Sequence, residues 1–308
     1  MRVAYLIQTY HLPELALRLA QTIRRGSPDS VIVVSHDRTA PERPSIGLDS
    51  TVDVVLDGPG GRGDFSTVER FVDCLEWLRD NGLSVDWVVN LTGQDYPIRP
   101  ISDIENELAD ALSDAFLEFF PVMDPDCRWG PREGRSRYGF RYRFVRRELS
   151  GQQRRLLRPL AVLNILQPMI RFNTAYGLSI GVRSTDHVFS GTQACFGGSF
   201  YGALSAQAID VLFEAMESSP ALVSHFRNSL VPEEAFLQTV LVNRPELAVR
   251  NSSRRYYDFR GSVAGRPKVL TYEDLSEMRQ TDAWFARKFD PSVDAEVLDA
   301  IDAVLNPV

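Results

Sequence analysis

The chain has 308 residues, enough to bury a large core in one or two domains. Its hydrophobic content of 44% and charged content of 24% are ordinary for a globular protein, and no stretch approaches the ~18 uncharged apolar residues that would cross a bilayer. The net charge of −7 argues against a nucleic-acid-binding protein. The three scattered cysteines (Cys74, Cys127 and Cys195) have no metal-ligand spacing and fit a reduced, cytoplasmic setting.

The first part of the chain alternates between strand and helix patterns. We expect strands over residues 2–8, 31–35, 52–56 and 86–91, and helices over residues 13–25 and 65–81. The second strand is a continuous β-branched run, which is typical of a strand buried on both faces. The first helix ends at Arg24-Arg25-Gly26, a common stop signal. This alternation predicts a mostly parallel α/β sheet flanked by helices.

Polar groups follow two of the predicted strands directly. His36-Asp37-Arg38 ends the second strand, and Gly93-Gln94-Asp95 follows the fourth. In open α/β sheets, ligands bind outside the carboxyl ends of the strands, so we expect both groups at the binding edge. The glycine-rich loop at residues 58–63 lacks G-x-G-x-x-G spacing after a strand, and no Walker A sequence occurs. A dinucleotide-binding dehydrogenase or a P-loop enzyme is therefore disfavoured.

The later part of the chain contains fewer clear elements. We expect a strand over residues 115–121 that carries Glu118, a short helix over 160–170, a strand over 194–204 and a helix over 206–217. The glycines at 197, 198 and 202 indicate that the backbone of the predicted strand over 194–204 comes close to another group. We therefore predict a single folded unit over residues 1–308, with a mixed segment inserted from about 122 to 190.

The inserted segment is unusually basic. Between Arg128 and Arg158 there are eleven arginines against Glu133 and Glu148, so this segment carries +9 and the remainder −16. Aromatic residues, Trp129 among them, are interleaved with the arginines. One interpretation is a solvated face that balances an acidic body. The other is a surface for an anionic partner, either an acidic or lipid-linked glycan or, as a rival function, a nucleic acid.

A helix start is predicted at Val231-Pro232-Glu233-Glu234. Pro232 suits the first turn, and both glutamates would lie at the positive end of the helix dipole. Phe236, Leu237, Val240 and Leu241 would form its apolar stripe. The pattern fits an ordinary helix start, and it equally fits a carboxylate held at the rim of a cleft as a general base.

Cations near the C-terminus could hold a departing diphosphate. Only Lys268 and Lys288 are lysines, and Lys288 lies between aromatic residues in Trp284–Asp290. It is either a partly desolvated phosphate ligand or a surface lysine that extends to solvent. Residues 254–259, Arg-Arg-Tyr-Tyr-Asp-Phe, offer charge and stacking surface, or form an edge strand. The sole Asp-x-Asp spacing, Asp124-Pro125-Asp126, indicates a proline turn rather than a metal site.

Five separated motifs resemble the core-2/I-branching β-1,6-N-acetylglucosaminyltransferases and their peptide O-xylosyltransferase relatives. They occur in the order of that family and span nearly the whole chain. They are Val34-Ser35-His36-Asp37-Arg38, Asn90-Leu91-Thr92-Gly93-Gln94-Asp95-Tyr96-Pro97-Ile98, Gly198-Ser199-Phe200-Tyr201-Gly202-Ala203-Leu204-Ser205, Val231-Pro232-Glu233-Glu234 and Phe285-Ala286-Arg287-Lys288-Phe289-Asp290.

This resemblance implies a GT-A fold and an inverting transfer from a UDP-sugar without a metal or other cofactor. UDP-GlcNAc is the first expectation for the donor and UDP-xylose the second. The catalytic base of the family corresponds to Glu234, and its phosphate-holding lysine to Lys288. Either Arg266 or Lys268 would be the second diphosphate contact, with Arg255 as a further candidate.

The resemblance also implies where the two substrates bind. Uridine contacts are expected near Gln8 and Asp37. The acceptor, a glycan or glycolipid that is anionic if the arginines contact it, would bind near Glu118, Arg128, Trp129, Tyr257 and Phe259. Residues 1–121 would then form the nucleotide-binding half, 122–190 the acceptor-side insertion, and 191–308 the catalytic and diphosphate-binding half.

Eukaryotic members of this family carry a membrane anchor, a stem and many cysteines, and this chain shows neither an anchor nor many cysteines. We therefore expect a soluble bacterial-type member in the cytoplasm, with peripheral membrane contact left open. A carbohydrate-binding or inactive relative remains a third alternative.

Overall fold

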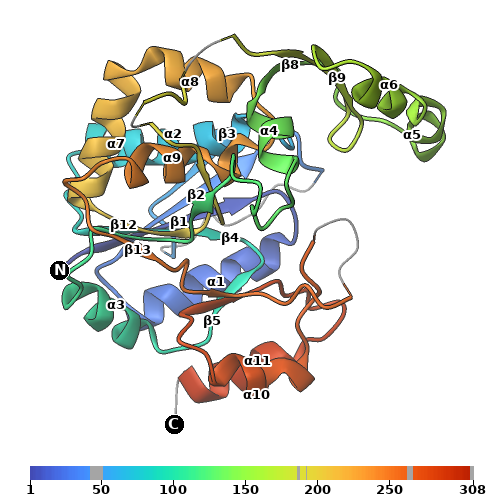
Figure 1. Ribbon diagram of the computed structural model, residues 1–308. Coiled ribbons are helices and arrows are strands. Elements are labelled where there is room, and N and C mark those ends of the chain that lie inside the picture. The colour runs from blue at the N-terminus through green and yellow to red at the C-terminus, as the bar shows by residue number, and fades with distance from the viewer. Residues whose placement is uncertain (42–50, 186–187, 192, 262–265, 306–308) are drawn as a thin grey trace.

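The computed structural model describes residues 1–41, 51–185, 188–191, 193–261 and 266–305 (Figure 1). Its centre is a seven-stranded sheet in the order β13-β6-β12-β4-β1-β2-β3. The strands are β1 (Val3–Thr9), β2 (Val31–Asp37), β3 (Val54–Gly58), β4 (Trp87–Thr92), β6 (Ala115–Leu117), β12 (Gly202–Ser205) and β13 (Val249–Asn251). Strand β12 pairs antiparallel with β4 and β6, and the other pairs are parallel. The predicted α/β class and mostly parallel sheet are confirmed.

Helices cover both faces of this sheet (Figure 1). One face packs against α1 (Pro13–Gly26) and α3 (Ile101–Ala109). The other packs against α2 (Ser66–Asp80), α7 (Ala206–Ser218), α8 (Pro220–Arg227) and α9 (Phe236–Val242). Successive strand residues point to opposite faces of the sheet. Tyr5 packs in the core beneath α1 and α3, and Leu6 packs in the core on the other face. Every residue of β1 and β2 is buried, as expected for strands covered on both sides.

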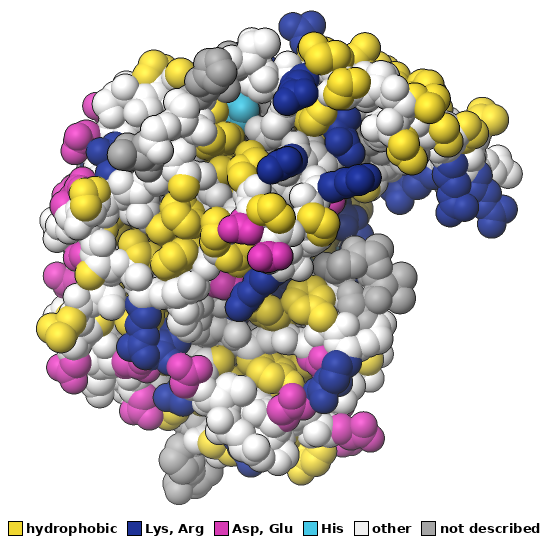
Figure 2. Space-filling model, in the orientation of Figure 1, with side chains coloured by type: hydrophobic (Ala, Val, Ile, Leu, Met, Phe, Trp, Pro, Cys, Tyr) yellow, Lys and Arg dark blue, Asp and Glu magenta, His cyan; other side chains and the backbone are white. Residues whose placement is uncertain are grey.

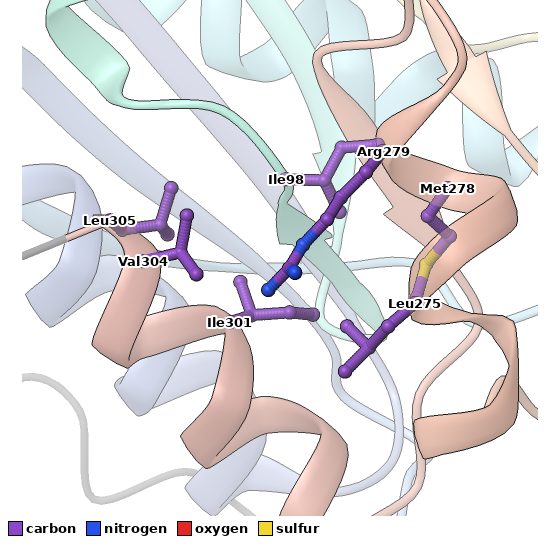
Figure 3. Close-up of a pocket in the computed structure, with 7 residues that line it drawn as sticks. All are labelled: Ile98, Leu275, Met278, Arg279, Ile301, Val304 and Leu305. Atoms are coloured by element: carbon purple, nitrogen blue, oxygen red, sulfur yellow. The ribbon is translucent and has the colours of Figure 1, made fainter.

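A smaller three-stranded sheet supports the C-terminal part. It contains β5 (Asp95–Pro97), β14 (Arg255–Tyr256) and β15 (Phe285–Arg287) in the order β14-β15-β5. A 3-10 turn (Tyr272–Asp274), α10 (Leu275–Arg279) and α11 (Glu296–Leu305) complete this region. The hollow drawn in Figure 3 lies between α10 and α11, and the Arg279 side chain extends across it. Its volume of about 10 Å³ holds no more than one water, so it is a packing gap rather than a ligand site.

The basic insertion forms an arm that projects from the body at the upper right of Figure 1. The insertion begins with α4 (Glu133–Tyr138), which packs against the body, and the arm beyond it contains β8 (Phe140–Arg146), α5 (Gly151–Leu157), α6 (Leu160–Leu166), β9 (Ile170–Asn173) and β10 (Leu178–Arg183). The three strands form an antiparallel sheet in the order β8-β10-β9. The helix predicted over 160–170 is too long, because it ends before Pro168 and the chain re-enters a strand at Ile170. Within the described ranges, no helix combines the length and apolarity needed to cross a membrane.

The stretch predicted as one strand over 194–204 is two strands in different sheets. β11 (Phe196–Gly197) pairs with β7 (Phe120–Pro121), and β12 belongs to the central sheet. The chain breaks at Gly198, which lies so close to the Glu118 carbonyl that a Cβ atom would come within 1.8 Å of that oxygen. The close backbone approach indicated by the glycines is therefore real, and it interrupts the strand.

The helix predicted to begin at Pro232 is also divided. Pro232–Glu234 form a separate 3-10 turn, and α9 begins only at Phe236, after Ala235 leaves helical geometry at φ −146°. The apolar stripe of α9 is buried as predicted. The placement of Glu233 and Glu234 in the first turn of that helix is wrong, because the break at Ala235 separates them from its hydrogen-bonded backbone.

Candidate functional site

A cleft of about 1010 Å³ opens at the carboxyl ends of the parallel strands. Gln8 near the end of β1, Asp37 at the end of β2 and Thr92 at the end of β4 all line it. Glu118, which directly follows β6, lines it as well. The strand ends thus deliver polar side chains to one place, as the parallel topology requires.

Ten of the twelve side chains predicted for substrate binding or catalysis line this cleft. They are Gln8, Asp37, Glu118, Arg128, Trp129, Glu234, Tyr257, Phe259, Arg266 and Lys288. The two others, Arg255 and Lys268, do not line it. The residues that do line it come from all three predicted parts of the chain, so their convergence is a property of the tertiary structure.

The Asp37 side of the cleft is tightly packed. The Asp37 carboxylate accepts hydrogen bonds from the Thr39 backbone N–H and hydroxyl at 2.8 and 2.6 Å. Gly60 lies against both residues, and a Cβ atom there would come within 2.2 Å of Asp37 Oδ1. Gln8 donates to the Thr67 carbonyl at 3.0 Å, which ties β1 to the first turn of α2. This corner is a narrow polar slot in which backbone and side-chain groups are already positioned.

Arg70 adds a buried cation beside this slot. It extends from α2 and donates to the Thr9 carbonyl at 3.2 Å, while its Nε is buried and has no hydrogen-bond partner among the described residues. Burial lowers the pKa of Arg70, and the charge of Asp37 opposes that shift. A guanidinium that is buried next to an open cleft increases the positive potential felt by a bound anion.

Glu233 and Glu234 form what we call the acidic wall of the cleft. The Glu234 carbonyl accepts from the Gly198 N–H at 2.8 Å, and the Val231 N–H donates to the Gly63 carbonyl at 3.0 Å. These two bonds hold the 3-10 turn against neighbouring loops. The Glu234 Oε2 atom accepts from Arg137 Nη1 at 2.5 Å, so an arginine of the inserted segment orients the carboxylate.

Arg137 is itself fixed from two sides. Its Nε donates to Glu133 at 2.8 Å, one turn away on α4, and its guanidinium lies over the Trp129 ring at 4.5 Å. Its side chain is only 15% exposed. Arg137 therefore links the predicted base to the predicted acceptor-side aromatic residue.

Glu233 occupies an unusual environment. Glu233 lines the cleft, yet its Oε2 atom is shielded from solvent and has no hydrogen-bond partner in the described structure. Burial, reinforced by the nearby charge of Glu234, raises the pKa of Glu233 to about 8. The acidic wall thus pairs a carboxylate held by arginine with a carboxyl group that gains or loses its proton near neutral pH.

Arg266, Arg287 and Lys288 form the cationic wall. Strand β15 pairs with β5. Just past the end of that pairing, the Phe289 N–H donates a hydrogen bond to the Gln94 carbonyl at 3.0 Å. The Gln94 side-chain amide in turn donates a hydrogen bond to the Phe289 carbonyl at 3.1 Å. Burial, followed by repulsion from Arg266 and Arg287, lowers the pKa of Lys288. A lysine crowded by other cations is suited to bind an anion that would relieve this repulsion.

A buried aspartate supports the cationic wall from below. Asp95 is fully buried and lies 3.3 Å from Arg287 Nε and 3.7 Å from Arg255 Nε. Arg287 lies over the Tyr201 ring at 4.4 Å, and both residues line the cleft. Arg255 is completely buried beneath them and donates to the Asn90 carbonyl at 2.8 Å. Its position is that of a support for the wall rather than of a group that faces the cleft.

The structure also separates Arg266 from Lys268. Lys268 Nζ lies 2.7 Å from Asp274 and 3.1 Å from Asp258, and it does not line the cleft. Arg266 does line it and contributes to the lowered pKa of Lys288. Of the two candidates for a second diphosphate contact, Arg266 is therefore the one in position.

The five predicted acceptor residues gather around Glu118. Its carboxylate accepts from Arg128 Nη1 at 2.6 Å and from the Tyr257 hydroxyl at 2.7 Å. The Tyr257 and Phe259 rings meet edge to face at 5.4 Å, and the Phe259 side chain stays half exposed. Trp129 lines the cleft as well and meets the Phe120 ring edge to face at 5.0 Å, and Arg128 lies over that Phe120 ring. Aromatic faces beside a fixed carboxylate are a suitable surface for a polar ring with hydroxyl groups.

The cleft is positively charged although the chain is not. Among the described residues, seven arginine and lysine side chains line it against five aspartates and glutamates, whereas the chain carries −7. This reversal favours an anionic ligand. Among the residues that the structure places, no group of three His, Cys, Asp or Glu side chains could hold a metal ion. Asp124 and Asp126 lie exposed in a turn in which the Asp124 carboxylate accepts from the Asp126 N–H at 2.8 Å.

Several residues that line the cleft or contact its lining are absent from the sequence-based predictions. Arg287 has a signal, because it precedes Lys288 and the cation pair stands among aromatic residues. Glu233 belongs to the predicted helix start, and no local pattern distinguishes it from Glu234. Arg70 and Arg137 have no signal at all, because each is one arginine of a helix and only its packing neighbours give it a role.

No model of a protein family matches this sequence, and a search of curated proteins finds no matching relative. The interpretation of the cleft therefore rests on its geometry and on the motif resemblance described above.

Proposed function

We propose that the protein is an inverting, metal-independent glycosyltransferase of GT-A type that transfers a sugar from a UDP-sugar to a hydroxyl group of a glycan or glycolipid. The observation that carries this proposal is the convergence of Glu234 and Lys288 on one cleft, although 53 residues separate them in the sequence. An acid and a set of cations that line the same cleft are the two elements that such a transfer needs without a metal.

In the proposed reaction, the acceptor hydroxyl oxygen attacks the anomeric carbon of the donor sugar. The bond between that carbon and the diphosphate oxygen breaks, and its electron pair leaves with UDP. The hydroxyl proton passes to the Glu234 carboxylate. Lys288, Arg287 and Arg266 offset the charge that develops on the diphosphate, and the backside attack inverts the anomeric centre.

The polar slot around Asp37 and Gln8 would hold the uridine, since it lies at the strand ends and is lined by oriented hydrogen-bonding groups. The group around Glu118 would hold the acceptor. Arg137 would be a positioning residue for Glu234, because it touches the carboxylate and would not touch the reacting atoms.

Binding of donor candidates tests the proposal at its first step. We expect UDP-GlcNAc, with UDP-xylose as the second choice, to raise the melting temperature of the full chain, and ADP and GDP-mannose at equal concentration to have no effect. A ligand that binds only the native state stabilises it by about 2.7 kcal/mol at 100 times its Kd. Equal shifts with every nucleotide, or no shift with any UDP-sugar, would contradict the donor assignment.

Metal independence has a separate test. We expect UDP release in the presence of an acceptor to continue in EDTA and to gain nothing from added manganese. Loss of that activity in EDTA and recovery on adding manganese would overturn the assignment of the cationic wall as the group that offsets diphosphate charge.

A further inference from the structure

The projecting arm exposes an unusual number of hydrophobic side chains. Nine of the sixteen large hydrophobic side chains that are exposed in the described residues lie between Val145 and Val182. Leu156 and Ile165 are each 80% exposed, and Leu166 is 73% exposed. The others in the arm are Val162, Leu163, Met169 and Ile170. Figure 2 shows these hydrophobic side chains gathered along the arm at the upper right. A concentration of this kind marks an interaction surface.

The part of the arm beyond Glu148 is basic and free of acids. Residues 149–185 contain five arginines and no aspartate or glutamate. Arg154, Arg155 and Arg158 are exposed on α5 and at its end, and none of them has an acidic partner among the residues that the structure describes. Figure 2 shows Lys and Arg side chains beside the hydrophobic ones on this arm. The occupant of this surface must therefore accept both apolar side chains and unpaired positive charge.

A second copy of the chain would fit poorly. A symmetric contact through this face would bring the same arginines of two subunits together without any acid from residues 149–185 to neutralise them. An anionic lipid surface meets both requirements, because its acyl boundary takes up apolar side chains and its headgroups attract each nearby arginine.

We propose that the arm is a docking surface for membranes that contain anionic lipid, with α5, α6 and the start of β9 as the inserted part. This inference goes beyond the proposed sugar transfer and does not depend on it. Arg147 and Tyr176, at the base of the arm, line the cleft. Docking would therefore bring the mouth of the cleft to the lipid surface, where a lipid-linked acceptor would be within reach.

Vesicle flotation with the full chain tests this proposal directly. We expect binding to vesicles of phosphatidylcholine and phosphatidylglycerol in about equal amounts, and at least about tenfold weaker binding to phosphatidylcholine alone. Ile165→Ser combined with Leu166→Ser should weaken binding to the anionic vesicles by about tenfold or more, because it removes two of the most exposed apolar side chains. The matched control is Leu112→Ser combined with Val293→Ser, which removes two exposed apolar side chains from the body and should bind as the wild type does.

A charge series separates the electrostatic contribution. Replacing Arg154, Arg155 and Arg158 by Gln should weaken binding to anionic vesicles by about tenfold or more and flatten its salt dependence. The same change at Arg79, Arg250 and Arg279, which are exposed on the body, gives an equal change in net charge and should have little effect.

Two outcomes would overturn the proposal. One is a wild-type chain that floats equally with both vesicle types or with neither. The other is an oligomer in solution that the Ile165→Ser, Leu166→Ser variant converts to a monomer while vesicle binding is absent, since the arm would then be an interface between copies. Both results are independent of enzymatic activity, so they would leave the proposed transfer unaffected.

Discussion

The two walls of the cleft are built in different ways. The cationic wall is supported by the β5–β15 pairing, whose backbone hydrogen bonds hold Lys288 in place, and by the buried Asp95, which lies beside Arg287. The acidic wall stands on a single 3-10 turn, and an arginine of the inserted segment orients Glu234. The difference indicates that the cationic wall is preformed in the body, whereas the acidic wall depends on the insertion.

The largest effect is expected at Glu234. Glu234→Gln keeps the shape of the side chain but cannot accept the hydroxyl proton, so kcat should decrease by about 10³-fold with little change in donor affinity. Steady-state rates of UDP release with acceptor, together with UDP-sugar titration, measure both quantities. Glu148→Gln, at another acid that lines the cleft, is the matched control. Turnover close to that of the wild type in Glu234→Gln would refute the base assignment.

The next largest effect is expected at Lys288. Lys288→Gln removes a cation from the preformed wall, and kcat/KM should decrease by about 10²-fold because the leaving diphosphate loses charge stabilisation. Lys268→Gln should stay within a few-fold of the wild type, since its ammonium is paired with Asp258 and Asp274 outside the cleft. The reverse order of these two effects would reassign the diphosphate contact.

Arg137 tests whether the acidic wall depends on the insertion. Arg137→Gln should lower kcat by about tenfold while leaving the KM for the donor unchanged, because Glu234 loses its orienting partner. Arg137→Lys, which keeps the charge but not the planar contact with Trp129, should recover part of that loss. An equal rise in the KM for the donor would instead place Arg137 in donor binding.

The smallest effect on turnover at neutral pH is expected for Glu233→Gln, whereas its effect on stability should develop as the pH rises from 4.5 to about 8. The pKa of Glu233 is raised from its ordinary 4.5 to about 8, so the protonated form is favoured in the folded protein. Its contribution to stability is complete below pH 4.5 and is lost as the pH rises through about 8. Glu233→Gln should therefore be more stable than the wild type at pH 9, by about 2 to 4 kcal/mol, with little difference at pH 4.

Thermal unfolding of both proteins across this range measures the effect on stability. The KM for the donor should also rise above pH 8 in the wild type, because a second negative charge appears beside Glu234, and it should stay flat in Glu233→Gln. Parallel pH dependences of the two proteins would show that Glu233 does not titrate in this range.

The sheet was predictable because its signals are local. The β-branched run of β2, the stop signal of α1 and the polar residues after β2 and β4 each depend on a few neighbouring residues. Two of the failures have the opposite cause. The helix at Pro232 is broken at Ala235, and the strand at 194–204 is broken at Gly198, where the backbone must pass the Glu118 carbonyl. Local propensity contains no information about that contact.

The candidate residues divide in a similar way. Glu234 and Lys288 belong to motifs of consecutive residues, and the family resemblance of those motifs makes them candidates. Arg137 and the distinct environment of Glu233 could not be identified from the sequence, since neighbours from distant segments create both. Arg255 is part of a recognisable motif, yet its complete burial became evident only with the packing of β14 against β15.

The sequence by itself determined the α/β class, the strand ends at which polar groups collect, and ten of the side chains that line the cleft, because these follow from short periodic patterns and from motifs of adjacent residues. Only the tertiary structure decided that Arg266 rather than Lys268 reaches the cleft, that Glu233 and Glu234 occupy different environments, and that the basic insertion projects as an arm with an apolar surface. Each of these depends on which distant segments exclude water from a given side chain, and that is set by the packing of the whole chain.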